Sequence, residues 1–206
     1  MRLAFLRHGP TDWNAQDRIQ GRIDMPLSEA GRALMAGLLP PDGFEAARAF
    51  TSPLGRARET AALLGYAGAI PDARLSEHHW GAWEGLTRAE ILARDGADAF
   101  AHAGSGIDFT PKDGESTRAL LARVADFIRD VAGAPGDAVA IAHRGILRSA
   151  YTLATGWDMA TAMPAKLDLS AALILEVEAG GTPRIAALNV PLKPRTAPAC
   201  GTRARS

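Results

Sequence analysis

The sequence has little cysteine, lysine or aromatic residue, and no excess charge of either sign. Its single cysteine, Cys200, excludes a disulfide framework and a zinc site built on several thiolates. The 23 basic and 23 acidic residues cancel, which argues against a nucleic-acid-binding protein driven by bulk charge. No apolar run approaches the roughly 18 to 20 residues that span a bilayer, and the N-terminal one is too short for a signal peptide. We therefore expect a soluble, cytoplasmic protein with no membrane or nucleic-acid partner.

The length of 206 residues and the hydrophobic content of 47% suit one globular domain. We predict that this domain covers residues 1–190 and that residues 191–206 form a basic tail. The tail holds three prolines and four basic residues but no acid. Two interpretations stay open for it: a mobile or loosely docked terminus, or a basic arm that touches a partner or an anionic substrate. The sequence gives no indication of oligomeric state.

Short apolar runs alternate with helical patterns along the chain. The runs predict buried strands at residues 3–6, 138–142, 172–177 and 184–188. One helix is expected from Ser28 to near Pro40, with Leu34, Met35, Leu38 and Leu39 on a common face. Further helices are expected to begin at Ser52-Pro53, to run from Ser116 to Gly133, and to cover 145–154. This alternation predicts an α/β sandwich with a largely parallel sheet.

Two histidines follow predicted strands, each beside an arginine and a glycine. They stand in Arg7-His8-Gly9 and in His143-Arg144-Gly145. Ligands of such sheets bind beyond the carboxyl ends of the strands, so both triplets are expected at one site. Neutral imidazole can attack phosphorus, arginine neutralises phosphoryl oxygens, and glycine allows a close backbone approach. Arg56, early in the helix that Ser52-Pro53 is expected to open, is a further candidate for the phosphate clamp.

Metal binding is the competing interpretation of this site. A zinc ion would draw its ligands from His8, His143, His78, His79 and Glu77. The sequence contains no closely spaced ligand pair such as His-x₃-His, and neighbouring arginines would repel a divalent cation. We therefore expect neither a metal nor a cofactor.

These motifs, with others in the same order, resemble the histidine phosphatase superfamily, which has the phosphoglycerate-mutase-like fold. Six blocks carry the resemblance over roughly residues 2–190: LRHGPTDWN (6–14), QGRIDMPLSEAG (20–31), TSPLGRARETA (51–61), LSEHHWGAWEG (75–85), GES (114–116) and AIAHRGILR (140–148). The resemblance implies a three-layer α/β/α sandwich with a mostly parallel mixed sheet. Within the superfamily, the chain looks similar to the α-ribazole phosphatases and to broad-specificity acid phosphatases.

The resemblance also implies a role for each matching residue. His8 matches the nucleophile that becomes phosphorylated, and Glu77 matches the proton donor to the leaving group. A positioned acid of this kind contributes about 10²- to 10⁴-fold to the rate. His143 is expected either as a neutral hydrogen-bond donor or as an imidazolium. The remaining matches are Arg7, Arg56 and His143 for the phosphoryl pocket, and Thr11, Asn14, Gln20 and Gly21 for binding at its rim.

Two positions depart from the family pattern. Pro10 stands where many relatives have Glu or Gln, and it removes one backbone donor next to the nucleophile. Arg144 stands where the family usually has glycine, and a positive φ there would strain it. Arg144 then either reaches the substrate or lies over the helix that follows.

Three functions are compatible with these residues: a phosphomonoester phosphatase, a cofactor-dependent phosphoglycerate mutase, and a non-catalytic phosphate-binding protein. Retention of His8 and Glu77 argues against the last. Residues 95–113 offer only Lys112 against four aspartates, which favours an uncharged leaving group and hence a phosphatase. The aromatic mouth expected above the phosphate site suits a small phosphorylated metabolite such as α-ribazole phosphate or a sugar phosphate. This mouth would consist of Trp80, Trp83, Phe100, Ile107 and Phe109.

Overall fold

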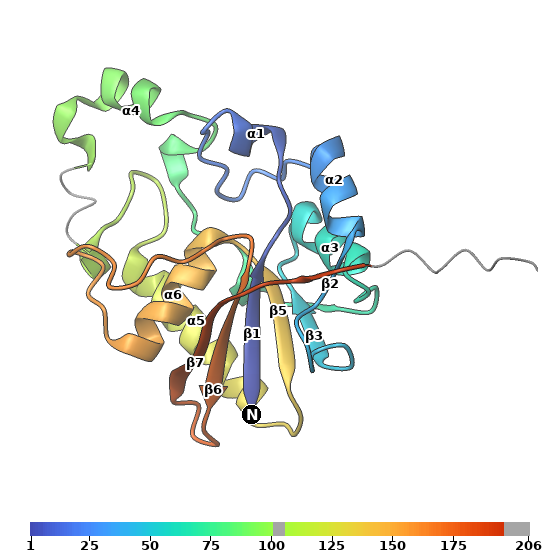
Figure 1. The fold of residues 1–206 in the computed structure, drawn as a ribbon. Coiled ribbons are helices and arrows are strands. Elements are labelled where there is room, and N and C mark those ends of the chain that lie inside the picture. Colours follow the sequence, from blue (N-terminus) through green and yellow to red (C-terminus); the bar gives the residue numbers. More distant parts are fainter. Residues whose placement is uncertain (101–105, 196–206) are drawn as a thin grey trace, which may run out of the picture.

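The structure is a computed structural model that describes residues 1–100 and 106–195 (Figure 1). Its centre is a six-stranded sheet with the strand order β4-β3-β5-β1-β6-β7. Strands β1, β3, β4 and β5 run parallel, whereas β6 and β7 are antiparallel additions at one edge. The mostly parallel mixed sheet is therefore confirmed. The strands are β1 (Arg2–Arg7), β3 (Arg48–Thr51), β4 (Ile70–Pro71), β5 (Ala138–Ala142), β6 (Ala172–Val177) and β7 (Pro183–Val190).

Helices cover both faces of this sheet (Figure 1). On one face lie α5 (Thr117–Ala132) and α6 (Arg144–Thr155); on the other lie α2 (Glu29–Ala36) and α3 (Gly55–Leu63). Side chains of β1 alternate between the two cores: Leu3 and Phe5 pack with α5 and α6, and Ala4 and Leu6 pack with α3. The chain thus forms the three-layer sandwich that its resemblance implies.

Beyond the carboxyl ends of the parallel strands lie the short helix α1 (Asp12–Ala15) and a cap around α4 (Arg88–Asp95). The cap has its own small apolar cluster, built on Trp83, Ile91 and Phe109. This end of the sheet is where the fold rule for parallel strands places a ligand. The cap also contains the 3₁₀ turns η2 (Gly81–Trp83) and η3 (Ala97–Phe100), with η1 (Ala73–Leu75) leading into it.

Helix boundaries confirm some predictions and correct others. Ser28 and Ser116 cap α2 and α5, as expected. The prediction that Ser52-Pro53 opens a helix is wrong, because α3 begins at Gly55 after a Leu54 cap without side-chain bonding. The common apolar face predicted for the helix after Ser28 is also wrong. That helix ends at Ala36, Leu34 is 49% exposed, and the next two leucines form strand β2 (Leu38–Leu39).

The first residues of the predicted tail lie along the body. Strand β8 (Lys193–Pro194) pairs with β2, and the Arg195 backbone N–H donates to the Gly37 carbonyl over 2.7 Å. The Lys193 ammonium forms an ion pair with Asp42 at 2.7 Å. Residues 196–206 lie outside the described residues, so the role proposed for the tail stays a prediction. In the described part of the chain, no helix is both long and apolar enough for a membrane span.

Candidate active site

A cavity of about 600 Å³ opens at the carboxyl ends of β1 and β5. Eight of the ten predicted catalytic and binding residues line it, whereas Thr11 and His143 do not. One of the eight is Gly21. The other seven are Arg7, His8, Asn14, Gln20, Arg56, Glu77 and Arg144. His143 lies beneath the cavity, with its ring centroid 5.1 Å from that of His8. We call Arg7, His8, Arg56 and His143 the phosphate floor.

His8 directly follows β1, and its backbone N–H donates to the Ala142 carbonyl at the end of β5 (2.9 Å). Its Nδ1 lies 2.7 Å from the carbonyl oxygen of Gly9, which can only accept a hydrogen bond. The hydrogen of the neutral ring therefore sits on Nδ1, and Nε2 keeps its lone pair. Burial, and then the charges of Arg7 and Arg56, hold the pKa of His8 well below its usual range. His8 thus presents a neutral Nε2 at pH 7.

His143 follows β5, and its side chain is fully buried. Its Nε2 lies 2.7 Å from the Ser52 hydroxyl, while Nδ1 has no hydrogen-bond partner among the described residues. Burial, and then the neighbouring His8 and Arg56, hold the pKa of His143 well below its usual range. Of the two protonation states left open by the sequence, the neutral ring is favoured. Ser52, predicted as a helix cap, instead orients this ring.

Arg56 is fully buried early in α3 and is anchored by backbone carbonyls. Its terminal nitrogens donate to Ile23 and Gly21 over 2.8 Å each. The Nε atoms of Arg56 and Arg7 are buried and have no partner among the described residues. Unpaired buried donors beside a nucleophile suit the oxygens of a phosphoryl group.

Glu77 enters the cavity between η1 and η2. Its Oε1 accepts the backbone N–H groups of His78 (2.8 Å) and of Gly145 at the start of α6 (3.0 Å). Its Oε2 has only a longer contact of 3.2 Å with the Gly145 nitrogen. A β-carbon at position 145 would lie 2.3 Å from Oε1, so this approach requires glycine. Oε1 is therefore fixed, and Oε2 is the oxygen left to carry a transferable proton.

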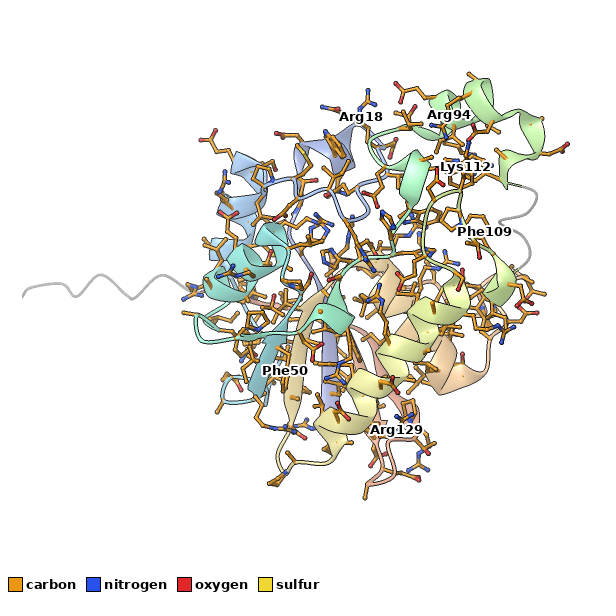
Figure 2. The ribbon with its side chains drawn as sticks, turned by 180° about the vertical axis from the view of Figure 1, so that it is seen from behind. Arg18, Phe50, Arg94, Phe109, Lys112 and Arg129 are labelled. Atoms are coloured by element: carbon orange, nitrogen blue, oxygen red, sulfur yellow. The ribbon has the colours of Figure 1, made fainter. Side chains whose placement is uncertain are left out.

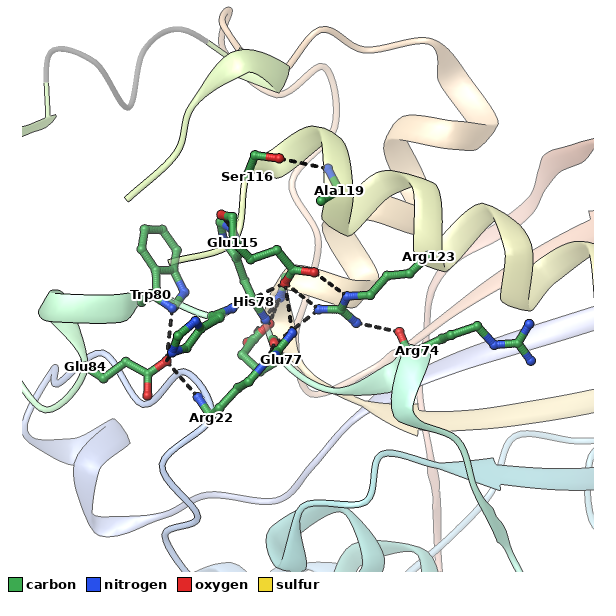
Figure 3. A network of polar contacts seen from close by, with 12 residues as sticks. Arg22, Arg74, Glu77, His78, Trp80, Glu84, Glu115, Ser116, Ala119 and Arg123 are labelled. Atoms are coloured by element: carbon green, nitrogen blue, oxygen red, sulfur yellow. Dashed lines mark hydrogen bonds and ion pairs between the residues drawn. The ribbon is translucent and has the colours of Figure 1, made fainter. Parts of the chain in front are cut away.

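Arg123 on α5 holds the segment that carries Glu77 (Figure 3). Its Nη2 donates to the Glu77 carbonyl (3.2 Å) and its Nη1 to the Arg74 carbonyl, while Nε pairs with Glu115 at 2.7 Å. The His78 ring is tied to the same region, because its Nε2 lies 2.7 Å from the Glu115 carbonyl. Sequence reasoning missed Arg123. The available signal is its place beside Val124, inside the buried stripe of α5.

The predicted polar rim divides into two groups. Asn14, Gln20 and Gly21 line the cavity, whereas Thr11 caps α1 and bonds to Asn14 through its hydroxyl. Thr11 therefore acts on the rim through Asn14. Gly21 has a φ of +53°, and a β-carbon there would lie 2.1 Å from Glu84 Oε1. Glycine at this position allows the Glu84 carboxylate to approach the loop that contributes the rim.

The outer part of the cavity is both aromatic and cationic. Trp80, Phe100 and Phe109 line it as predicted, but Trp83 and Ile107 do not. Four further arginines also line it, and we call them the arginine mouth: Arg18, Arg88, Arg144 and Arg148. The expectation of an uncharged leaving group rested on residues 95–113 alone and stays a prediction. Lys112 does not line the cavity, and the four arginines of the mouth all come from segments outside residues 95–113. Figure 2 labels Arg18, Phe109 and Lys112.

The structure removes the concern about strain at Arg144. This residue is the first of α6, with His143 as the extended N-cap, and so does not require a positive φ. Among residues 1–100 and 106–195, no three His, Cys, Asp or Glu side chains gather closely enough to hold a metal ion.

Comparisons with known proteins agree with this geometry. A family model described as Histidine phosphatase superfamily (branch 1) matches residues 3–191. A glucosyl-3-phosphoglycerate phosphatase of Mycobacterium tuberculosis (strain ATCC 25618 / H37Rv) is 36% identical over 160 residues, which cover 71% of each chain. A 2,3-bisphosphoglycerate-dependent phosphoglycerate mutase 2 of Gloeobacter violaceus is 35% identical over 125 residues, which cover 56% of each chain.

Solved structures show the same fold. A mycobacterial glucosyl-3-phosphoglycerate phosphatase in complex with VO3 superposes with a TM-score of 0.77 at 30% identity, covering 92% of this chain and 98% of that one. Bacillus stearothermophilus YhfR superposes with a TM-score of 0.75 at 32% identity, covering 92% and 96%. The narrower resemblance to α-ribazole phosphatases stays a prediction.

Proposed function

Because the chain belongs to the histidine phosphatase superfamily and is a phosphoric monoester hydrolase, we propose that it cleaves a small phosphorylated metabolite through a phosphohistidine at His8. The observation that carries this proposal is the state of His8. Its Nδ1–H is committed to the Gly9 carbonyl, and Nε2 keeps its lone pair beside unpaired arginine donors. A nucleophile and its charge clamp are thus preorganised in one buried place.

In the first step, His8 Nε2 attacks phosphorus, and the bond from phosphorus to the ester oxygen breaks. Arg7 and Arg56 neutralise the charge on the phosphoryl oxygens, and His143 Nδ1 donates to one of them. Glu77 gives the proton on Oε2 to the departing oxygen, so the alcohol leaves neutral. The negative charge of a bound phosphate favours the protonated form of a nearby carboxyl group.

In the second step, the Glu77 carboxylate takes a proton from water while the water oxygen attacks phosphorus. The bond between phosphorus and Nε2 breaks, the electron pair returns to His8, and inorganic phosphate leaves. Glu77 is then protonated again, so the cycle closes without a metal or cofactor step.

For the substrate we propose a phosphorylated sugar or sugar-acid derivative. The names of the mycobacterial relatives point to glucosyl-3-phosphoglycerate, and the aromatic wall of Trp80, Phe100 and Phe109 suits stacking of a sugar ring. α-Ribazole phosphate and simple sugar phosphates are alternative substrates to be compared in the same assay.

A panel of phosphate monoesters tests the proposal, with released phosphate as the measurement. We expect release from p-nitrophenyl phosphate and from at least one sugar phosphate. His8→Ala should lower turnover by about 10³-fold or more and should abolish transfer of labelled phosphate to the protein. Arg58→Gln, an exposed change on α3 away from the cavity, is the matched control and should retain both. Equal activity in His8→Ala at an unchanged melting temperature would remove His8 from the mechanism.

A mutase is the second candidate, favoured by the arginine mouth, because reorientation of a bisphosphate needs cations away from the phosphate floor. The same panel, with 3-phosphoglycerate and its 2,3-bisphosphate included, distinguishes the two. Isomerisation of 3-phosphoglycerate in excess of phosphate release would identify a mutase.

A further inference from the structure

Two arginines on α6 face the cavity and form no ion pair with any acid that the structure describes. Arg144 and Arg148 stand four positions apart, so they project from the same side of the helix, about 6 Å apart along its axis. Both line the cavity. None of the ion pairs formed within residues 1–100 and 106–195 involves either of them.

The surroundings of Arg148 destabilise its positive charge when no anion is bound nearby. Its guanidinium lies 5.1 Å from the centroid of the Trp157 ring, and the side chain is half-buried. Burial, and then the charge of Arg144, lower the pKa of Arg148. Arg18, in the same mouth, differs because Glu90 pairs with it at 2.9 Å. Arg148 is thus partly removed from water beside a like charge, and an anion bound between the two arginines would stabilise it.

Arg144 connects this pair with the phosphate floor. Burial is the main cause of the lowered pKa of Arg7 and of Arg148, and the charge of Arg144 lowers both further. Arg144 therefore lies within electrostatic reach of both. Of the described residues that line the cavity, six are arginines, and only Asp17 and Glu77 are acids. Arg18 pairs with Glu90, and Arg56 lies 3.7 Å from Asp24. Among the described residues, Arg144 and Arg148 are therefore two of the lining arginines whose charge no ion pair offsets.

We propose that Arg144 and Arg148 form a second anion subsite, which holds a carboxylate or a second phosphoryl group on the leaving alcohol of the substrate. This inference rests on the proposed phosphatase function and deepens it. The substrate class is a phosphate monoester with further negative charge a few bonds from the ester oxygen. The planar guanidinium groups match carboxylate and phosphoryl oxygens, so the subsite both orients the ester and selects against neutral analogues.

Matched substrate pairs test the subsite. 3-Phosphoglycerate and glycerol 3-phosphate differ by a carboxylate, and glucose 1,6-bisphosphate and glucose 6-phosphate differ by a phosphoryl group. For each pair the measurement is the ratio of the two kcat/KM values for phosphate release, charged over neutral. We expect a wild-type ratio well above one for at least one pair, and that pair identifies the anion.

Arg144→Gln and Arg148→Gln should each lower that ratio about tenfold or more, because a hydrogen-bonded ion contact is lost. Arg58→Gln removes the same charge at an exposed position outside the cavity and should leave the ratio unchanged. A wild-type ratio near one for both pairs overturns the subsite. A ratio that neither variant changes also overturns the subsite. So does a ratio that falls only in Arg88→Gln, a lining arginine of α4.

A binding experiment tests the subsite separately from the proposed phosphatase activity. In the His8→Ala background, calorimetry compares the Kd of 3-phosphoglycerate, glycerol 3-phosphate and the two glucose phosphates, with and without Arg144→Gln. The subsite is supported if a charged ester binds more tightly than its neutral analogue and Arg144→Gln weakens that binding. This holds even if the wild type releases no phosphate, a result that would refute only the proposed phosphatase activity. Equal affinities throughout overturn the subsite whatever the activity.

Discussion

The phosphate floor and the arginine mouth present guanidinium groups to one cavity, but they differ in burial and in anchoring. Arg56 in the floor is fully buried, and its terminal nitrogens are held by backbone carbonyls. Arg144 in the mouth is exposed, and Arg148 rests on an aromatic ring. Arg56 is therefore held in place before substrate arrives. In the mouth, Arg18 is anchored by the Gly85 carbonyl and Glu90, whereas the described residues give Arg144 and Arg148 no ion pair.

This difference separates chemistry from selection. A fixed, desolvated floor stabilises charge as it develops on the phosphoryl group, because no reorganisation is required. In a solvated mouth each contact contributes less binding energy, but these contacts are made to the leaving alcohol, which is the part that differs between substrates. Glu77 lies between the two regions, with Oε1 bound to the start of α6 and Oε2 available for proton transfer. Variants of the floor, of Glu77 and of the mouth should consequently fail in different ways.

Glu77→Gln gives the largest effect expected at the boundary between the regions. The glutamine keeps the shape of the side chain, and its amide oxygen can still accept from His78 and Gly145, but it has no proton for the leaving group. We expect kcat to fall about 10²- to 10⁴-fold on glycerol 3-phosphate and far less on p-nitrophenyl phosphate, whose leaving group hardly needs protonation. Phosphate release from the two substrates measures this. A uniform loss on both would contradict the role of proton donor.

Arg123→Gln should produce a weaker version of the same split, because Arg123 positions Glu77 without touching the substrate. Loss of its bonds to the Glu77 carbonyl and to Glu115 leaves the segment less firmly held. We expect about a tenfold lower kcat on glycerol 3-phosphate, little change on p-nitrophenyl phosphate, and a stability loss of about 1 to 3 kcal/mol.

The matched control for Arg123 is Arg129→Gln on the same helix. Arg129 is 60% exposed, and its one ion pair within the described ranges is with the exposed Asp126. It does not line the cavity and lies near the far end of α5 (Figure 2). Arg129→Gln should leave kcat unchanged on both substrates. If Arg123→Gln lowers kcat on both substrates by the same factor, Arg123 stabilises the fold without positioning Glu77.

Three of the four floor residues could be predicted from the sequence because they adjoin strand ends, whereas Arg56 lies in α3. Arg7 and His8 follow β1, His143 follows β5, and parallel strands bring their carboxyl ends together. The local sequence pattern was therefore enough to place them. The pattern was misleading at Ser52, because a hydroxyl before proline is typical of a helix start. Here the Ser52 hydroxyl hydrogen-bonds to the ring of His143, 91 positions away. Nothing within the local sequence encodes that pairing.

The mouth could not be predicted in the same way. Arg18 and Arg88 reach the cavity because the α1 loop and the cap lie over the strand ends. The position of the cap depends in turn on its small apolar cluster, built on Trp83, Ile91 and Phe109. The composition of residues 95–113 indicated an acidic cover, although the cations come from elsewhere. Arg148 did carry a signal, since it stands one helical turn after Arg144.

The smallest expected effect concerns the cost of burying the floor, measured as melting temperature against pH. His8 and His143 have pKa values held well below the usual range, whereas in the unfolded chain they protonate near pH 6.5. Below about pH 6.5 the unfolded state therefore binds more protons than the folded state, and stability falls as pH falls. Between pH 7.5 and 5.5 each histidine should cost about 1.4 kcal/mol, or a few degrees of melting temperature.

Carboxylates with lowered pKa values, such as Glu115, act only at lower pH, so they do not account for a loss in this window. His8→Gln should remove its share of the slope, because glutamine does not titrate, whereas Arg144→Gln in the mouth should leave the slope unchanged. Inorganic phosphate should raise the melting temperature of the wild type, since an anion bound at the floor offsets the buried positive charge. His78, whose pKa is also lowered by burial, contributes to the slope in the same window and remains in both variants. A slope as steep as that of the wild type in His8→Gln and in His143→Gln would show that the floor is not the acid-sensitive region.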